Sequence, residues 1–274
     1  MSKTKNNIEK ENNAFYYYER GLAYYSAGNY QEAINNFNKA IDLDPSNVYY
    51  YCFRGASYRD SENYNKAIEN FNKAIDLDPN NASYYNNRGI SFNRLKEYEK
   101  AIDDFNKAIE LNPNNASYYN NRGFAYNNLK DYKKAISDFD KAIKLDPNYT
   151  LAYNNRGVAY NSLKDYRKAI NDYEKAIKLD LDYALSYNNR GLAHNSLGEY
   201  EKAIRDFDKT IKLNPNYISA YNSRGVAYNN LKYYKKAIRD FDKAIKLDPN
   251  YTFAYNNRAV VYNNLGKYIS SLKF

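Results

Sequence analysis

Apolar residues recur at helical spacing along the chain, in paired segments separated by short polar turns. Between residues 152 and 180, one segment carries apolar side chains at Tyr153, Val158, Tyr160 and Leu163. The next segment carries them at Tyr166, Ala169, Ile170, Tyr173, Ala176 and Ile177. Steps of three and four residues place side chains on one face of an α-helix. The pattern therefore predicts two helices that form a hairpin.

This hairpin pattern returns every 34 residues without an insertion. An Arg-Gly pair marks each repeat, and its glycine, taken as position 8, occurs at Gly21, Gly55, Gly89, Gly123, Gly157, Gly191 and Gly225, with Ala259 in the eighth copy. Seven complete repeats are expected to begin at residues 14, 48, 82, 116, 150, 184 and 218, followed by a partial eighth at 252–274. Residues 1–13 read as a polar N-terminal tail. A strict period of this length is typical of an array whose neighbouring repeats share a core.

Turn-forming residues follow the same period. Proline occupies position 32 in six of the seven complete repeats, and Leu181 takes its place in the other. Position 16 carries N-cap residue types in several repeats, namely Asn29, Asn63, Asp131 and Asp165. The second helix of each hairpin is therefore expected to begin after position 16 and to be stopped by the proline. Every glycine and proline is used by the repeat, so none remains for a linker or a phosphate-binding loop.

The residues that define the period resemble the tetratricopeptide repeat. Its pattern has an aromatic residue at position 4, Gly at 8, Tyr at 11, Ala at 20, Phe at 24, Ala at 27 and Pro at 32. The fourth repeat matches throughout, with Tyr119, Gly123, Tyr126, Ala135, Phe139, Ala142 and Pro147. The chain departs from the family at position 7, which is Arg in every repeat. The resemblance implies an all-α solenoid of helix-turn-helix hairpins wound into a right-handed superhelix, with the first helices on its concave side.

Packing predictions follow from the small and large residues. Gly at 8 and Ala at 20 and 27 allow close helix approach, and aromatic rings at 4, 11 and 24 fill the space between helices. Repeats 1–4 carry Tyr at position 3 after a preceding Asn, whereas repeats 5–8 carry Tyr149, Tyr183, Tyr217 and Tyr251 before Ala152, Ser186, Ala220 and Ala254. These two sites share a helix face, so one ring is expected at each junction, although duplication alone also permits the exchange. Arg at position 7 is predicted to pair with Asp at position 23.

The composition argues against an enzyme. The chain has one Cys and one His, which excludes a disulfide framework and a Cys/His metal site. Cys52 and His194 lie several repeats apart, so they are not expected to form a nucleophile pair, and no cofactor is predicted. No apolar run approaches the ~18 residues of a membrane span, and the first residues lack the apolar core of a signal peptide. An intracellular, cytoplasmic protein is the expectation.

The predicted groove of the first helices is rich in asparagine. Positions 2, 5, 9 and 12 form one helical stripe, and asparagine fills positions 5 and 12 from repeat 3 onward. Asparagine offers a donor and an acceptor, and the pattern is similar to the asparagine ladder of some tetratricopeptide domains, although AT-rich codon usage also explains it. The predicted peptide-binding groove comprises Asn86, Asn87, Asn120, Asn121, Phe124, Asn127, Asn154, Asn155, Val158, Asn161, Asn188, Asn189, Leu192, Asn195, Asn222 and Asn256. These asparagines are expected to face the groove, so that replacing Asn120, Asn154 and Asn188 leaves stability nearly unchanged.

Charge adds two alternatives to the leading interpretation. The leading one is a non-enzymatic scaffold that binds an extended, weakly charged protein or peptide segment and does not bind nucleic acid. Residues 116–274 carry 27 basic and 16 acidic residues, so a basic convex face could instead bind nucleic acid or an anionic surface. The incomplete last repeat suggests, as a third interpretation, a substrate-recruiting fragment of a larger enzyme. The incomplete repeat also predicts end-to-end self-association, because it lacks the polar outer face of a terminal repeat.

Overall fold

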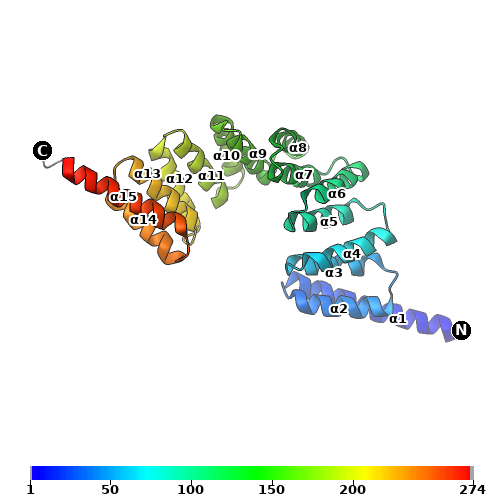
Figure 1. Cartoon of the computed structure of the whole chain (residues 1–274). Helices are drawn as coiled ribbons and strands as arrows, with labels where there is room; N and C mark the ends of the chain where they lie inside the picture. Colours follow the sequence, from blue (N-terminus) through cyan, green and yellow to red (C-terminus); the bar gives the residue numbers. More distant parts are fainter. Residues whose placement is uncertain (1, 272–274) are drawn as a thin grey trace. The chain divides into compact units, whose positions relative to one another are not determined.

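The chain folds into a series of helical hairpins (Figure 1). The computed structural model describes the backbone of residues 2–271 and the side chains of residues 13–266. The first helices of the eight repeats are α1 (Ser2–Ser26), α3 (Val48–Asp60), α5 (Ala82–Arg94), α7 (Ala116–Asn128), α9 (Thr150–Ser162), α11 (Ala184–Ser196), α13 (Ile218–Asn230) and α15 (Thr252–Ser271). The second helices are α2 (Tyr30–Leu43), α4 (Tyr64–Leu77), α6 (Tyr98–Leu111), α8 (Tyr132–Leu145), α10 (Tyr166–Leu179), α12 (Tyr200–Leu213) and α14 (Tyr234–Leu247).

These helices confirm an all-α solenoid of helical repeats. Two compact units divide the chain, one spanning residues 1–145 and the other residues 146–274. Within each unit, a second helix packs against its own first helix and, where the next repeat belongs to the same unit, against the first helix of that repeat. The helix α1 includes most of the predicted polar tail. The right-handed superhelix stays a prediction.

The second helices begin where the N-cap residues predict. Asn29, Asn63 and Asp165 each accept a hydrogen bond from the backbone N–H three residues on, at 3.5, 3.4 and 3.3 Å. Such a bond satisfies one of the free N–H groups of a helix start. The turn just before it places position 15 in the left-handed region, with φ of 75° at Gly198 and 62° at Lys164. Glycine suits this conformation best and also adopts it at Gly28, whereas lysine or glutamate adopts it in the remaining described turns of this kind.

The second helices end without needing proline. The helix α10 ends at Leu179, as its equivalents do, although Leu181 replaces proline there. Asp180 follows the helix, and its Oδ1 accepts from the backbone N–H of Asp182 at 3.0 Å. Asp or Asn makes the same bond at this position in the other complete repeats. This local bond competes with further helix, so the acidic or amide side chain at position 31 explains the common end point better than proline alone.

The glycine at position 8 permits the closest contact of each hairpin. A Cβ atom on Gly191 would lie 2.7 Å from Cε1 of Phe207, and the other position-8 glycines meet an aromatic ring in the same way. Phe207 is fully buried, with Ala203 beside it at 0% exposure. The predicted complementarity of small residues and rings is therefore confirmed, and burying such a ring stabilises the fold by about 2–3 kcal/mol.

The exchange of tyrosine between repeats keeps a ring at the junction. Tyr50, Tyr84 and Tyr118 are buried, and the preceding asparagines accept N-cap hydrogen bonds. In the second unit, the ring of Tyr217 packs against the cluster of Ala203, Phe207 and Ala220. Tyr217 makes no side-chain cap bond, so repeat 7 keeps the ring and gives up a cap that contributes about 1 kcal/mol.

Candidate functional site

One face of the first helices carries exposed apolar side chains. We call the side chains at positions 2 and 9, which lie two turns apart, the first-helix face. In the second unit this face presents Leu151, Leu185 and Leu192, with 39%, 36% and 38% of each residue exposed, and Val158 is half-buried beside them. In the first unit it presents Phe124 at 43% exposure. These apolar members of the predicted groove are therefore open to solvent or only half covered.

Three of the predicted groove asparagines are not open. Asn120, Asn154 and Asn188 are only 2%, 1% and 4% exposed. The expectation that they face the groove is wrong, because all three side chains are buried. At Asn154, Ser186 and Asn189 of the next first helix cover the amide. At the same position, Asn86 and Asn222 are half-buried and Asn256 is exposed. Removing a buried amide therefore affects stability, contrary to the sequence-based expectation.

Hydrogen bonds join position 5 of one repeat to position 6 of the next. Nδ2 of Asn121 donates to Oδ1 of Asn86 at 2.9 Å, and Nδ2 of Asn257 donates to Oδ1 of Asn222 at 2.9 Å. We call each such pair an asparagine seam. A third seam joins Asn189 to Asn154 at 3.2 Å, and the hydroxyl of Ser186 also donates to Asn154 at 3.1 Å.

Sequence reasoning missed these seams because it placed positions 5 and 6 on one common surface. The separation of 35 residues between partners, one more than the repeat, was the available signal. Two further groove asparagines have other surroundings. Asn87 accepts from Nη1 of Arg59 at 2.8 Å, and Asn155 is half-buried. The amides of the ladder therefore serve helix packing to a large extent.

Position 12 lies partly beneath the first-helix face. Asn127, Asn161 and Asn195 are half-buried there. Nδ2 of Asn195 donates to the backbone carbonyl oxygen of Ser223 at 3.2 Å. The Oδ1 atoms of all three are buried and receive no hydrogen bond from the described part of the chain. These residues are more exposed than Asn120, Asn154 and Asn188 at position 5.

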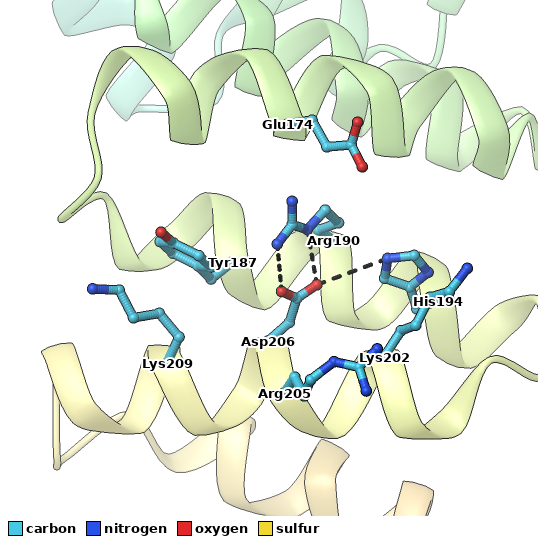
Figure 2. Close-up of a pocket in the computed structure, with 8 residues that line it drawn as sticks. All are labelled: Glu174, Tyr187, Arg190, His194, Lys202, Arg205, Asp206 and Lys209. Atoms are coloured by element: carbon cyan, nitrogen blue, oxygen red, sulfur yellow. Dashed lines mark hydrogen bonds and ion pairs between the residues drawn. The ribbon is translucent and has the colours of Figure 1, made fainter.

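The arginine at position 7 pairs with Asp at position 23, as predicted, and in several repeats it also binds the preceding second helix. We call these contacts the arginine clamp. Arg88 of α5 donates to Asp104 of α6 through Nε at 2.9 Å and Nη2 at 2.6 Å. Its Nη1 donates to Asn72 of α4 at 2.6 Å. Figure 2 shows the same two-pronged contact between Arg190 and Asp206. Burial raises the pKa of the Asp104 carboxyl, against the opposing hydrogen bond and charge of the arginine.

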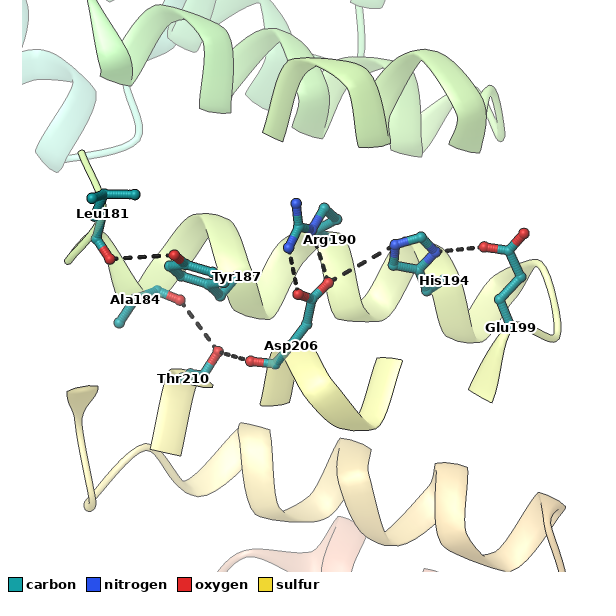
Figure 3. A network of polar contacts seen from close by, with 8 residues as sticks. All are labelled: Leu181, Ala184, Tyr187, Arg190, His194, Glu199, Asp206 and Thr210. Atoms are coloured by element: carbon teal, nitrogen blue, oxygen red, sulfur yellow. Dashed lines mark hydrogen bonds and ion pairs between the residues drawn. The ribbon is translucent and has the colours of Figure 1, made fainter. Parts of the chain in front are cut away.

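Cys52 and His194 occupy structural surroundings. Cys52 packs against the apolar cluster that includes Tyr50 and Tyr84. Burial raises the pKa of its thiol to about 11, so the reactive thiolate is scarce at neutral pH. His194 is 7% exposed, and its Nδ1 lies 2.6 Å from a carboxylate oxygen of Glu199 (Figure 3). The two residues belong to different units, and each is accounted for by packing around it.

Comparison with known proteins identifies the repeat. The tetratricopeptide repeat pattern matches residues 82–115, 116–149, 150–183, 184–217 and 218–251. Related patterns of the same repeat match residues 21–59, 55–96 and 241–273. The chain belongs to the tetratricopeptide repeat family. Repeats of this family, together with the solved structures below, support a role as a protein-interaction scaffold.

Solved structures share the tetratricopeptide repeat fold with this chain. A chain of the APC/C hetero-tetramer Cut9–Hcn1 matches with a TM-score of 0.76 and 20% identity over 88% of this chain, which spans 48% of that one. A tetratricopeptide repeat protein from Parabacteroides merdae matches with a TM-score of 0.72 and 20% identity, covering 92% of this chain and 99% of its own. YrrB, described as having an unusual peptide-binding site, matches with a TM-score of 0.56 and 24% identity, covering 69% of this chain and 97% of its own. No curated protein matches as a relative.

Among the helices of residues 2–271, none is both long enough and apolar enough to cross a membrane.

Proposed function

We propose that this tetratricopeptide repeat protein is a non-enzymatic scaffold that binds an extended, weakly charged peptide segment on the first-helix face. The observation that supports this most is the row of exposed leucines on α9 and α11. Leu151, Leu185 and Leu192 stay open although the hairpins around them are well packed. Neighbouring exposed apolar groups on a rigid frame are typical of an interaction site.

The chemistry of the face defines the partner. Asn120, Asn154 and Asn188 at position 5 are buried, so apolar contact supplies most of the binding energy. Covering the exposed third of one leucine contributes roughly 1.5 kcal/mol. Three such leucines only just offset an association cost of ~4 kcal/mol or more. The partner therefore needs aliphatic or aromatic side chains at intervals, along with polar contacts to amides such as Asn161 and Asn195.

The test begins with selection of binding peptides from a library of extended 12-residue segments, using the full chain as bait. Affinities are then measured for a variant with Leu151, Leu185 and Leu192 all changed to Ser. We expect at least a tenfold loss of affinity, because each leucine contributes about one factor of ten. The variant should also lose some stability, since about 60% of each leucine is covered in the fold, so affinity is measured at a temperature where the variant is fully folded.

A matched control lies on α10 and in the turns that follow α9 and α11. Leu179 of α10 is 39% exposed, as Leu151 is, and Leu163 and Leu197 are exposed in the turns. Changing these three leucines to Ser should alter affinity less than twofold. If the control variant loses binding and the first-helix variant retains it, the first-helix face is not the binding site.

A further inference from the structure

A pocket opens on the side of repeat 6 that is remote in register from positions 2 and 9. It has a volume of about 460 Å3 and lies among α10, α11 and α12 (Figure 2). Side chains from all three helices line it, including Glu174, Arg190, His194, Arg205, Asp206 and Lys209. Four residues of the lining are Lys or Arg and two are acidic, so the pocket is net basic.

Arg190 contributes an unused donor to this pocket. In repeat 7, the equivalent Arg224 uses Nη1 to bind Asp208 of the preceding second helix at 2.5 Å. In repeat 6 the equivalent acidic residue is Glu174, which makes no hydrogen bond or ion pair with the described residues. Nη1 of Arg190 likewise has no hydrogen-bond partner between residues 13 and 266. Figure 2 shows this nitrogen directed away from Asp206 and toward the space below Glu174.

His194 makes room beside that donor. Position 11 is an aromatic ring in every other repeat. In repeat 7 it is Tyr228, whose ring lies beneath the ammonium of Lys236 at 5.3 Å from ring centre to nitrogen. The shorter imidazole of His194 instead turns toward Glu199 (Figure 3). Repeat 6 therefore lacks the ring that would occupy this part of the surface.

The remaining charges complete a site for an anion. Arg205 forms no hydrogen bond or ion pair with the residues that the structure describes, so its guanidinium is free to bind. Lys209 lines the pocket 5.6 Å above the ring of Tyr187, and its Nζ lies 3.9 Å from a carboxylate oxygen of Asp182. Both carboxylate oxygens of Asp206 are engaged by Arg190. Glu174 makes no direct ion pair, but its charge acts on Arg190 and opposes an anion.

We propose that this pocket binds a phosphate monoester carried by a side chain of a partner protein. A phosphate dianion accepts several charge-assisted hydrogen bonds, and guanidinium groups match its geometry. Nη1 of Arg190 and the free guanidinium of Arg205 supply such donors from two helices, with Lys209 beside them. His at position 11 and Glu at position 25 of the preceding repeat occur together at repeat 6 alone, which favours one phosphate group over a nucleic-acid backbone. The site goes beyond peptide binding on the first-helix face.

The test uses N-acetyl-phosphoserine amide, its unphosphorylated twin and inorganic phosphate as probes, titrated into the full chain and followed by NMR. We expect the phosphorylated probe to shift signals from α10, α11 and α12, and the serine twin to shift none. Phosphate should compete with the phosphorylated probe. If inorganic phosphate binds more tightly than the phosphoserine probe, a protein-borne phosphate is not the ligand. If neither shifts these signals at millimolar concentration, the site does not exist.

Variants locate the effect. Arg205→Ala should weaken binding about tenfold, as loss of a charge-assisted contact does. His194→Tyr, which restores the usual ring, should abolish binding, and Glu174→Gln should tighten it by removing an opposing charge. Arg239→Ala changes the equivalent arginine of repeat 7 and should leave affinity within twofold. If Arg239→Ala weakens binding as much as Arg205→Ala does, the basic face acts as a general polyanion surface and the proposal fails. The proposal also fails if single-stranded DNA displaces the phosphoserine probe and both arginine changes weaken binding of that DNA equally.

Discussion

Repeats 6 and 7 have the same helical frame and satisfy their polar groups differently. Arg224 of repeat 7 binds two carboxylates, Asp240 of its own second helix and Asp208 of the preceding one. Arg190 of repeat 6 binds the carboxylate of Asp206 alone. Burial alone would lower the pKa of Arg224, but the hydrogen bonds to its two acids raise it. The residue at position 25 of the preceding repeat, Glu174 or Asp208, therefore decides whether the arginine binds one second helix or two.

The seams on either side of α11 show the same dependence. Toward α9, Asn154 receives hydrogen bonds from Asn189 and Ser186. Toward α13, Oδ1 of Asn188 is buried without a hydrogen bond from the residues that the structure describes. Position 6 of repeat 7, which supplies the donor elsewhere, is Ser223. The role of an asparagine in this array is thus set by the next repeat rather than by its own.

The largest expected effect contrasts the two arginine clamps. Asp206→Ala leaves the partly buried Arg190 without a carboxylate and should cost about 3 kcal/mol of local stability. Asp240→Ala leaves Arg224 with Asp208 and should cost about 1–2 kcal/mol. Hydrogen exchange of the amides in α11 to α14 measures both, because repeats open locally. Equal losses in the two variants would show that the second carboxylate does not matter.

A smaller effect is expected at the complete seam. Asn154→Ala removes the acceptor of both Asn189 and Ser186 and leaves their donors buried. The expected cost is about 1–2 kcal/mol, since an unsatisfied buried polar group is destabilising. Urea unfolding monitored by circular dichroism measures it. Asn256→Ala at the exposed equivalent position is the control and should change stability by less than ~0.5 kcal/mol.

The smallest effect is a gain at the incomplete seam. Ser223→Asn places an amide donor opposite Oδ1 of Asn188 and should stabilise the junction of α11 and α13 by about 1 kcal/mol. Slower amide exchange in these two helices is the measurement. The change should do nothing in an Asn188→Ala background, because the acceptor is then missing. A gain that persists in that background would mean that the seam is not its cause.

Much of the fold could be predicted from the sequence because local rules act within each hairpin. Helical spacing, the N-caps at Asn63 and Asp165, and the glycine opposite each aromatic ring all depend on residues close in the chain. Pairing of Arg at 7 with Asp at 23 also lies within one repeat. The common end of the second helices was attributed to proline, yet Leu181 shows that the side chain at position 31 suffices.

The candidate site was predicted less well because its geometry depends on contacts between repeats. Asn154 and Leu151 share the first helix, and periodicity alone placed both on the groove. The crossing of α9 and α11 buries Asn154 and leaves Leu151 exposed. The pocket of repeat 6 was missed for the same reason. It depends on His194 and Glu174 together, and these two residues belong to different repeats and differ from those at the same positions elsewhere in the chain.

The central claim is that the buried asparagines hold the repeats together while the exposed leucines bind the partner. One selected peptide and two variants test it: Asn154→Ala, and the triple change of Leu151, Leu185 and Leu192 to Ser. Affinity and unfolding free energy are measured for both at a temperature where both are folded. We predict that the folded leucine variant loses at least tenfold in affinity, as three apolar contacts require, and that the asparagine variant loses stability with affinity kept within threefold. The opposite result, with binding lost on changing Asn154 and retained without the leucines, would contradict the account.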